Sequence, residues 1–199
     1  MTTLLIYAGT CAADADVTRF GGLPLAPRDF IWPRCAECDG NMLFVAHLAT
    51  SEGGCEVFTC QNDPGLCDDW DPASGANCVL RFDGPDRVAV PAPTDGVTQL
   101  GAVTAVASVD DSRPYLEARV NWGPEHDQSV SAVLGQIGGV ASWLQADETP
   151  DCPTCERPMT LFAQLEEGYD TDTSANFGGG CAYVFTCGTC TEAAFGWQC

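Results

Sequence analysis

The stretch Cys35-Ala36-Glu37-Cys38-Asp39-Gly40-Asn41-Met42 returns later in the chain as Cys152-Pro153-Thr154-Cys155-Glu156-Arg157-Pro158-Met159. The shift is 117 residues, and it holds without a gap from Phe20-Gly21-Gly22, which falls on Ile137-Gly138-Gly139, to Leu48, which falls on Leu165. The shift then becomes 127 residues, where Val57-Phe-Thr-Cys60 matches Val184-Phe-Thr-Cys187. A gapless match of this length within one chain predicts an internal duplication.

Each copy of the repeat carries the pattern of two strands that follow a CxxC turn. An apolar stretch comes first, at 42–48 and 159–165, and a stretch that ends in cysteine comes second, at 56–60 and 182–187. Their β-branched and aromatic content favours strands over helices. Short apolar runs punctuated by proline and glycine predict further strands within 1–11 and at 79–82, 88–90 and 103–109.

Helical periodicity is scarce in the sequence. Residues 128–137 are the best helix candidate, because Asp127 precedes them as a potential cap. The sequence therefore predicts a β-dominated α+β fold, built by internal duplication of a zinc-ribbon-like β unit whose two halves pack together. We expect residues 1–199 to form one domain, with repeat 1 at 18–84, a connecting β region at 85–134 and repeat 2 at 135–199.

The duplication sorts eight of the thirteen cysteines into two quartets. The first contains Cys35, Cys38, Cys60 and Cys67, and the second contains Cys152, Cys155, Cys187 and Cys190. Zinc prefers four soft ligands in a tetrahedron, and a CxxC turn presents two thiolates on one side of it. The quartets predict two zinc ions, and both would be structural because four thiolates leave no open coordination position.

Two other interpretations of these cysteines remain open. They could be buried as small hydrophobic side chains around a vestigial site, since free cysteine is often buried. A CxxC pair can also take part in thiol–disulfide exchange, although redox pairs usually sit at the start of a helix. We expect the remaining cysteines to serve in packing, with Cys199 as an exposed thiol; they are Cys11, Cys55, Cys78, Cys181 and Cys199.

The chain is strongly acidic, with 28 Asp and Glu against 8 Lys and Arg and a formal net charge of −20. A field this negative repels phosphate backbones, so nucleic-acid binding and docking on anionic membranes are disfavoured. The charge suits a basic protein partner, a cytosol rich in salt, or an arginine-using, GC-rich genome. The run Asp68-Asp69-Trp70-Asp71 is a candidate contact for such a partner, and a solvated turn is its simpler interpretation.

Sequence features favour the cytoplasm. The first apolar run follows no Lys or Arg and is too short for a secretory signal. No stretch of about eighteen apolar residues predicts a membrane span. An odd number of cysteines with several CxxC pairs favours metal ligation in a reducing compartment.

Known catalytic motifs are missing from the sequence, which contains no nucleophile elbow, P-loop, HExxH motif or dinucleotide fingerprint. We expect His47 to be packed inside an apolar strand and His126 to be solvated, although His126, Glu125 and Asp127 could form a second metal or acid–base site. A zinc-stapled module that binds a protein partner, as chaperone, adaptor or immunity-type protein, is the leading hypothesis. A hydrolase with its active site between the repeats is the alternative.

The segments that carry the duplication also resemble a known family. Phe20-Gly-Gly-Leu-Pro24, Trp32-Pro33, the first CxxC turn and the strand at 42–48 are similar to the YwqG-like family of uncharacterised bacterial proteins. Repeat 2 follows the same pattern with Gly138-Gly139 and Phe162-Ala-Gln164-Leu165. His47 stands where that family has the glutamine that Gln164 keeps, so a shared ligand role for this position is not implied.

A more distant likeness is to the zinc-binding repeats of the programmed cell death protein 2 group. The shared features are a CxxC turn, an L-x-Q-type strand and a strand that ends in F-x-C followed by a further cysteine. The resemblance implies a protein-binding role, which in that group is the escort of a basic ribosomal protein.

Overall fold

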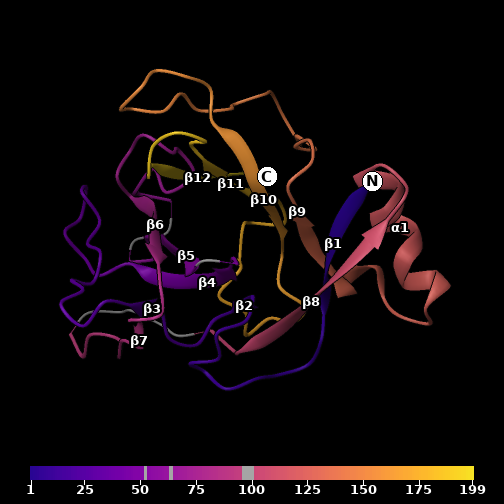
Figure 1. Ribbon diagram of the computed structural model, residues 1–199, viewed down its shortest axis with the longest axis horizontal. Helices are drawn as coiled ribbons and strands as arrows, with labels where there is room; N and C mark the ends of the chain where they lie inside the picture. The colour runs from indigo at the N-terminus through magenta and orange to yellow at the C-terminus, as the bar shows by residue number, and fades with distance from the viewer. Residues whose placement is uncertain (52, 63–64, 96–100) are drawn as a thin grey trace.

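Strands dominate the structure, a computed structural model that describes residues 1–51, 53–62, 65–95 and 101–199 (Figure 1). In these ranges the only helices are α1 at Tyr115–Glu125 and a 3₁₀ turn, η1, at Val130–Ala132. None of the helices described has both the length and the apolar character needed to cross a bilayer. The predicted β-dominated α+β fold is confirmed. The strands are β1 (Thr2–Tyr7), β2 (Arg19–Phe20), β3 (Leu25–Ala26), β4 (Leu43–Ala49), β5 (Gly53–Thr59), β6 (Asn77–Asp83), β7 (Val88–Ala89), β8 (Thr104–Asp111), β9 (Val133–Ile137), β10 (Thr160–Glu166), β11 (Cys181–Thr186) and β12 (Ala193–Gln198).

Ten of these strands form one sheet, in the order β12-β11-β10-β9-β1-β8-β2-β4-β5-β6. Repeat 2 supplies one end of the sheet and repeat 1 the other, and β1 and β8 pair with each other in the middle. These two strands are exchanged between the halves, because β1 pairs with β9 of repeat 2 and β8 pairs with β2 of repeat 1. Each half therefore completes its sheet with a strand from the other part of the chain.

The two halves agree in backbone detail as well as in sequence. A β-bulge interrupts β4 between Phe44 and Ala46, and another interrupts β10 between Leu161 and Ala163, at positions that the 117-residue shift superimposes. The glycine pairs at 21–22 and 138–139 all have positive φ angles, between 62° and 78°. The duplication predicted from the sequence is therefore a duplication of the three-dimensional unit.

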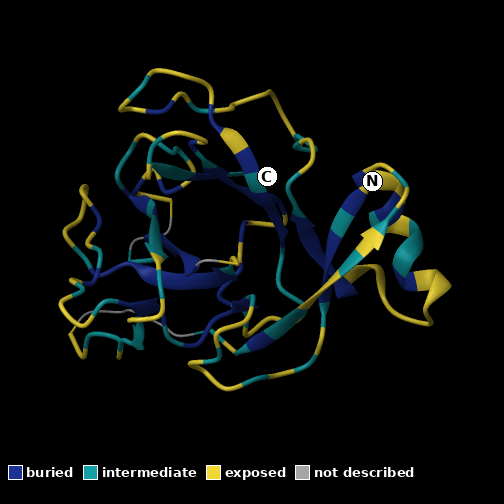
Figure 2. Cartoon of the chain, viewed as in Figure 1, coloured by how far each residue is buried: buried dark blue, intermediate teal, exposed yellow. Residues whose placement is uncertain are grey.

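One hydrophobic core serves both halves. Phe20 and Leu48 of repeat 1 and Leu165 and Phe195 of repeat 2 belong to the same buried cluster, together with Leu5 of β1. Figure 2 shows the buried residues concentrated along the strands, with exposed residues in the connecting loops. The predicted packing of the two halves against each other is confirmed.

The sheet curls until its edge strands, β6 and β12, lie next to each other (Figure 1). The loop that follows Cys67 lies against both edges. The backbone N–H of Trp197 in β12 donates to the carbonyl oxygen of Trp70 at 3.2 Å. The side-chain amide of Asn77 in β6 donates to the carbonyl oxygens of Asp69 and Asp71, both at 2.9 Å. One loop of repeat 1 thus joins the two edge strands of the sheet by hydrogen bonds.

The predicted helix at 128–137 is wrong. Residues Val130–Ala132 form η1 and Val133–Ile137 form β9. The strand depends on Gly135, whose φ is 143°, because a Cβ at this residue would lie 2.0 Å from the carbonyl oxygen of Gln164 in β10. The repeat itself indicates a strand here, because the 117-residue shift places Ile137 of β9 on Phe20, the last residue of β2.

The helix that does form, α1, was hidden in the sequence by Gly123 and Pro124 near its end. Both residues lie in its last turn, directly before the end of the helix at Glu125. Tyr115 and Ala118 are buried, and they pack with Leu4, Ile6 and Val133 in a small cluster on β1 and β9. The helix is therefore held by packing against the centre of the sheet.

We predict that neither half of the chain folds alone. A break after Asp95 would leave β1 without β9 and β8 without β2, so each fragment would lack hydrogen-bonding partners in the middle of the sheet. Circular dichroism and amide NMR spectra of the separate fragments should show unfolded chains, and co-expression should restore a folded complex. Dispersed amide resonances from either fragment on its own would contradict this prediction.

Candidate metal centres

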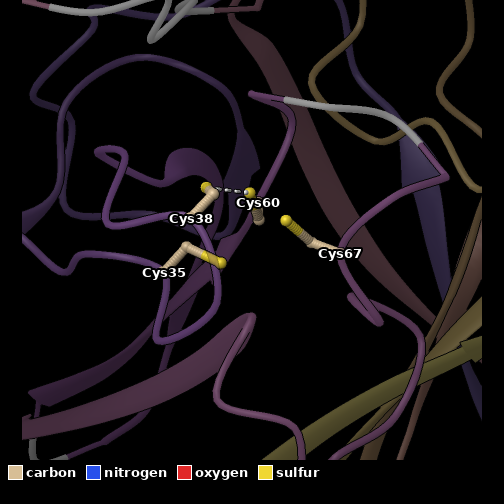
Figure 3. Close-up of side chains that lie close together, drawn as sticks. All are labelled: Cys35, Cys38, Cys60 and Cys67. Atoms are coloured by element: carbon tan, nitrogen blue, oxygen red, sulfur yellow. Dashed lines mark hydrogen bonds between the residues drawn. The ribbon is translucent and has the colours of Figure 1, made fainter.

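Three segments of repeat 1 bring the first cysteine quartet together (Figure 3). Cys35 and Cys38 lie in the turn before β4, Cys60 directly follows β5, and Cys67 lies in the loop before β6. The four sulfur atoms lie within 4.8 Å of one another, and Sγ of Cys38 is 3.6 Å from Sγ of Cys60. Cys38 is exposed, whereas the other three cysteines are buried.

The second quartet forms the corresponding cluster in repeat 2. Cys152 and Cys155 lie in the turn before β10, and Cys187 and Cys190 follow β11. Their sulfur atoms also lie within 4.8 Å of one another, with 3.7 Å between Sγ of Cys155 and Sγ of Cys187. The structure thus gathers all eight cysteines of the predicted quartets into two clusters.

The spacing of the sulfur atoms suits a tetrahedral metal ion. A metal–sulfur bond of about 2.3 Å, the value for zinc, places the sulfurs of a regular tetrahedron about 3.8 Å apart. The distances of 3.6 Å and 3.7 Å lie close to this value. No disulfide occurs, because all thirteen cysteines are free. Each cluster is therefore capable of holding one metal ion with a closed set of four thiolates.

The same two hydrogen bonds fix the backbone of both CxxC turns. In repeat 1 the N–H of Cys35 donates to the carbonyl oxygen of Gly40, and the N–H of Asp39 donates to that of Cys35, both at 2.9 Å. The corresponding bonds in repeat 2 join Cys152 to Arg157 and Glu156 to Cys152, both at 2.8 Å. Asp39 and Glu156 share a φ of 56°. Neither CxxC pair starts a helix, which removes the usual structural context of a redox pair.

Neighbouring donors stabilise several of the thiolates. A hydrogen bond from the backbone of Gly40 lowers the pKa of Cys38, and one from the Arg157 side chain lowers the pKa of Cys155. The Thr189 hydroxyl and nearby backbone N–H groups lower the pKa of Cys187 to about 6. Burial raises the pKa of Cys60, and a bound cation would favour its thiolate form.

The two clusters differ in their polar surroundings. In repeat 2, Nη2 of Arg157 donates to Oγ1 of Thr189 at 2.6 Å, and that hydroxyl lies 3.3 Å from Sγ of Cys187. In repeat 1, the amide of Asn62 donates to Sγ of Cys60 at 3.3 Å. A metal bound by four thiolates carries a net negative charge, and in repeat 2 the guanidinium of Arg157, hydrogen-bonded beside the cluster, compensates part of it.

The acidic run 68–71 is only partly available to a partner. Asp69 is buried, and its carboxylate accepts hydrogen bonds of 3.3 Å from Oγ1 of Thr59 and Nε2 of Gln61. Burial raises the pKa of Asp69. Asp71 accepts from the N–H of Ala73, as in a capped turn. Asp68 and Trp70 remain exposed, so they are the members of the run that a partner could contact directly.

His47 is fully buried in β4, as expected, between two carboxylates. Its Nδ1 lies 2.6 Å from Oε1 of Glu56, and its Nε2 lies 3.1 Å from Oδ1 of Asp16. Arg19 of β2 lies directly opposite His47 and donates to the carbonyl oxygens of Ala15 and Gly21. Strands β2, β4 and β5 therefore carry a buried row of ionisable side chains, Arg19, His47 and Glu56, whose contacts fix the loops around β2.

Repeat 2 has a neutral row at the corresponding positions. Gln136, Gln164 and Tyr183 replace Arg19, His47 and Glu56, respectively, under the two shifts. The N–H of Ser142 donates to Oε1 of Gln164 at 2.9 Å, and the hydroxyl of Tyr183 donates to the carbonyl oxygen of Ser142 at 3.1 Å. Both rows anchor loops, which explains why the position accepts either histidine or glutamine.

His126 is exposed, and it stacks on Trp122 with 4.4 Å between ring centroids. Glu125 instead pairs with Arg113, at 2.7 Å between Oε1 and Nη1. The three residues 125–127 do not form one of the ligand clusters found among the described residues. The structure therefore gives no support to a second metal or acid–base site here.

The five remaining cysteines occupy the places expected of packing residues. Cys55 and Cys181 are buried, Cys11 and Cys78 are half-buried, and Cys199 is exposed. Burial raises the pKa of Cys55 and of Cys181 to about 11, so both remain neutral thiols.

Comparison with known proteins gives one limited similarity. No family model matches the chain. The chain is 35% identical over 69 residues to an uncharacterized protein, YpfL, of Salmonella typhimurium strain LT2. The match covers 35% of this chain and 16% of that protein, so the chain spans only about a sixth of its relative's length.

We predict that Cys152→Ser destabilises the fold far more than Cys199→Ser. The first substitution breaks a four-thiolate cluster, whereas the second changes an exposed thiol. Loss of a structural metal costs several kcal/mol, and each kcal/mol lowers the melting temperature of a domain of this size by roughly 2–4 °C. Differential scanning calorimetry should therefore show a fall of about 10 °C for Cys152→Ser alone. Equal melting temperatures would contradict the assignment of Cys152 to a metal centre.

Proposed function

We propose that the protein is a zinc-stapled module of the cytoplasm that binds a basic protein partner, as a chaperone, adaptor or immunity-type protein. The observation that carries the proposal is the pair of matching four-thiolate clusters on a scaffold of net charge −20. Closed clusters of this kind serve structure, which leaves the acidic surface as the functional part of the molecule.

Zinc is the metal that best suits these clusters. Four cysteine ligands with tetrahedral spacing favour zinc or iron among the common metals, and zinc needs no redox partner. Each cluster lies beside a small apolar core, which contains Met42 and Phe58 in repeat 1 and Met159 and Phe185 in repeat 2. Metal binding would therefore contribute folding free energy to the outer part of each unit.

The net charge of −20 supports a basic partner. Attraction between a strongly acidic protein and a basic one accelerates encounter and makes it sensitive to salt. The distant resemblance of the repeats to the programmed cell death protein 2 group supports a protein-binding role, whereas the YwqG-like family is uncharacterised and adds no function. The match to YpfL adds no activity, because that protein is uncharacterized.

The alternative, a hydrolase with its site between the repeats, gains no specific support. One hollow between the halves is lined by Leu43, Gly101, Ala102 and residues 171–174, and another is lined by Gln61, Gly65, Asp69, Asn176, Gly178 and Trp197. Neither set contains a histidine, a cysteine or a pair of carboxylates that could share acid–base work. The binding module is therefore the better proposal.

We predict two zinc ions per chain. Elemental analysis of the protein purified without chelator or added metal should give this ratio, and Cys152→Ser should reduce it to one. A ratio of one in the unmodified chain would remove one of the two centres. Absence of zinc would overturn the proposal that the module is stapled by this metal.

We predict that the protein captures basic proteins from its native lysate at low salt and releases them at high salt. Screening of surface charge over a Debye length of about 10 Å at 0.1 M salt is the physical reason. An unrelated acidic protein of similar net charge serves as the control bait, so that general charge attraction can be subtracted. Recovery of no specific basic protein at either salt concentration would contradict the proposed function.

A further inference from the structure

A hollow of about 210 Å³ lies where the metal-bearing loop of repeat 1 meets repeat 2. Repeat 1 contributes Gln61, Gly65 and Asp69 to its lining, and repeat 2 contributes Asn176, Gly178 and Trp197. The hollow therefore exists only where the two halves come together, next to the loop that closes the sheet.

The carboxylate of Asp69 in this lining has no cationic side chain paired with it among the described residues. Asp69 is only 7% exposed, and its carboxylate is met by neutral donors, namely the hydroxyl of Thr59, the amide of Gln61 and the side chain of Trp197. A buried carboxylate without a cation is costly, and a cation that reaches it gains more than one at the open surface.

We propose that this hollow receives an arginine side chain of the basic partner, with Asp69 as its counter-ion. A guanidinium is planar, carries five N–H donors and stacks on aromatic rings. The lining includes the acidic Asp69, the amide-bearing Gln61 and Asn176, and the half-buried Trp197. Gly65 and Gly178 have no side chains and leave the hollow open at their positions.

The surface next to the hollow suits a protein partner. The loop that carries Asp69 also exposes Leu66, at 79%, and Trp70, at 45%. The backbone N–H of Asp68 donates to the exposed carboxylate of Glu37 at 3.2 Å, which places two acidic side chains beside these apolar ones. Apolar anchors beside a charged pocket are typical of the few residues that dominate binding energy in an interface.

The loop that lines the hollow is longer than the corresponding segment at the second metal centre. Residues 61–66 separate Cys60 from Cys67, whereas Gly188 and Thr189 alone separate Cys187 from Cys190. Hydrogen bonds from neutral donors give Asp69 a structural role in holding the loop. The proposed binding of a partner's cation is a second role for the same carboxylate. This proposal rests on the proposed function, because it names the side chain by which a basic partner would be recognised.

The test uses the full, metal-loaded chain and two small probes. N-acetyl-arginine methylamide should shift the indole N–H resonance of Trp197 in a titration followed by NMR. The matching citrulline compound has the same shape without the charge, and it should bind at least about tenfold more weakly, a difference of about 1.4 kcal/mol. Equal shifts with both compounds would overturn the proposal.

Two variants locate the effect. Asp69→Asn keeps the size of the side chain and removes its charge, and it should abolish the arginine shift. Asp110→Asn removes the same charge from an exposed position on β8 and should leave the shift unchanged. If Asp69→Asn does not fold, Asn176→Asp replaces it, because this exposed residue would add a carboxylate to the hollow and tighten arginine binding severalfold. An Asn176→Asp chain with unchanged affinity would contradict the proposal.

A displayed library of short random peptides separates this proposal from the proposed function. Enrichment of arginine-containing peptides that no longer bind Asp69→Asn would support both. Enrichment of basic peptides that bind Asp69→Asn equally well would overturn the hollow and leave the basic partner standing. If the arginine probe binds but no basic peptide is enriched, the hollow stands and the proposed function fails.

Discussion

Four sulfur atoms within 4.8 Å of one another are a demanding arrangement, and the fold builds it twice. Thiolates at this distance repel one another, whereas four neutral thiols would gain little from meeting there. A cation resolves the conflict by binding all four sulfurs. Each cluster joins the turn before one strand to the end of the next, so the loops at both outer ends of the sheet depend on the same condition.

The two repeats share the same strands and cysteine clusters but differ in the side chains and loops around the clusters. A row of ionisable side chains, Arg19, His47 and Glu56, crosses β2, β4 and β5, while Gln136, Gln164 and Tyr183 occupy the same places in repeat 2. Both rows hold loops by hydrogen bonds to the backbone, a task that amides and ions perform equally well. The connection between the third and fourth ligands is a larger difference, because six residues separate Cys60 from Cys67 and two separate Cys187 from Cys190.

Much of this was readable in the sequence, for physical reasons. The CxxC spacing is local, and the duplication linked each CxxC pair to its distant partners, so all eight cysteines were found. The sequence does not predict the strand at 133–137, because its apolar residues fit the spacing of a helix as well as that of a strand. Only contact with β10 selects the strand. The hollow around Asp69 cannot be predicted from the sequence, because its lining comes from distant segments that meet only through the curl of the sheet: Gln61, Gly65 and Asp69 from repeat 1, and Asn176, Gly178 and Trp197 from repeat 2.

The exchange of β1 and β8 also bears on how such a chain could arise. Thr3 pairs with Ile137 and Thr104 pairs with Phe20, so the two exchanged strands meet their neighbours in the same register. This places a pseudo-twofold axis between β1 and β8, relating the halves as the subunits of a symmetric dimer are related. A single ancestral unit would have completed its sheet by swapping its first strand with a second copy of itself. Fusion of two genes would then have fixed that partnership, freeing each copy to change independently.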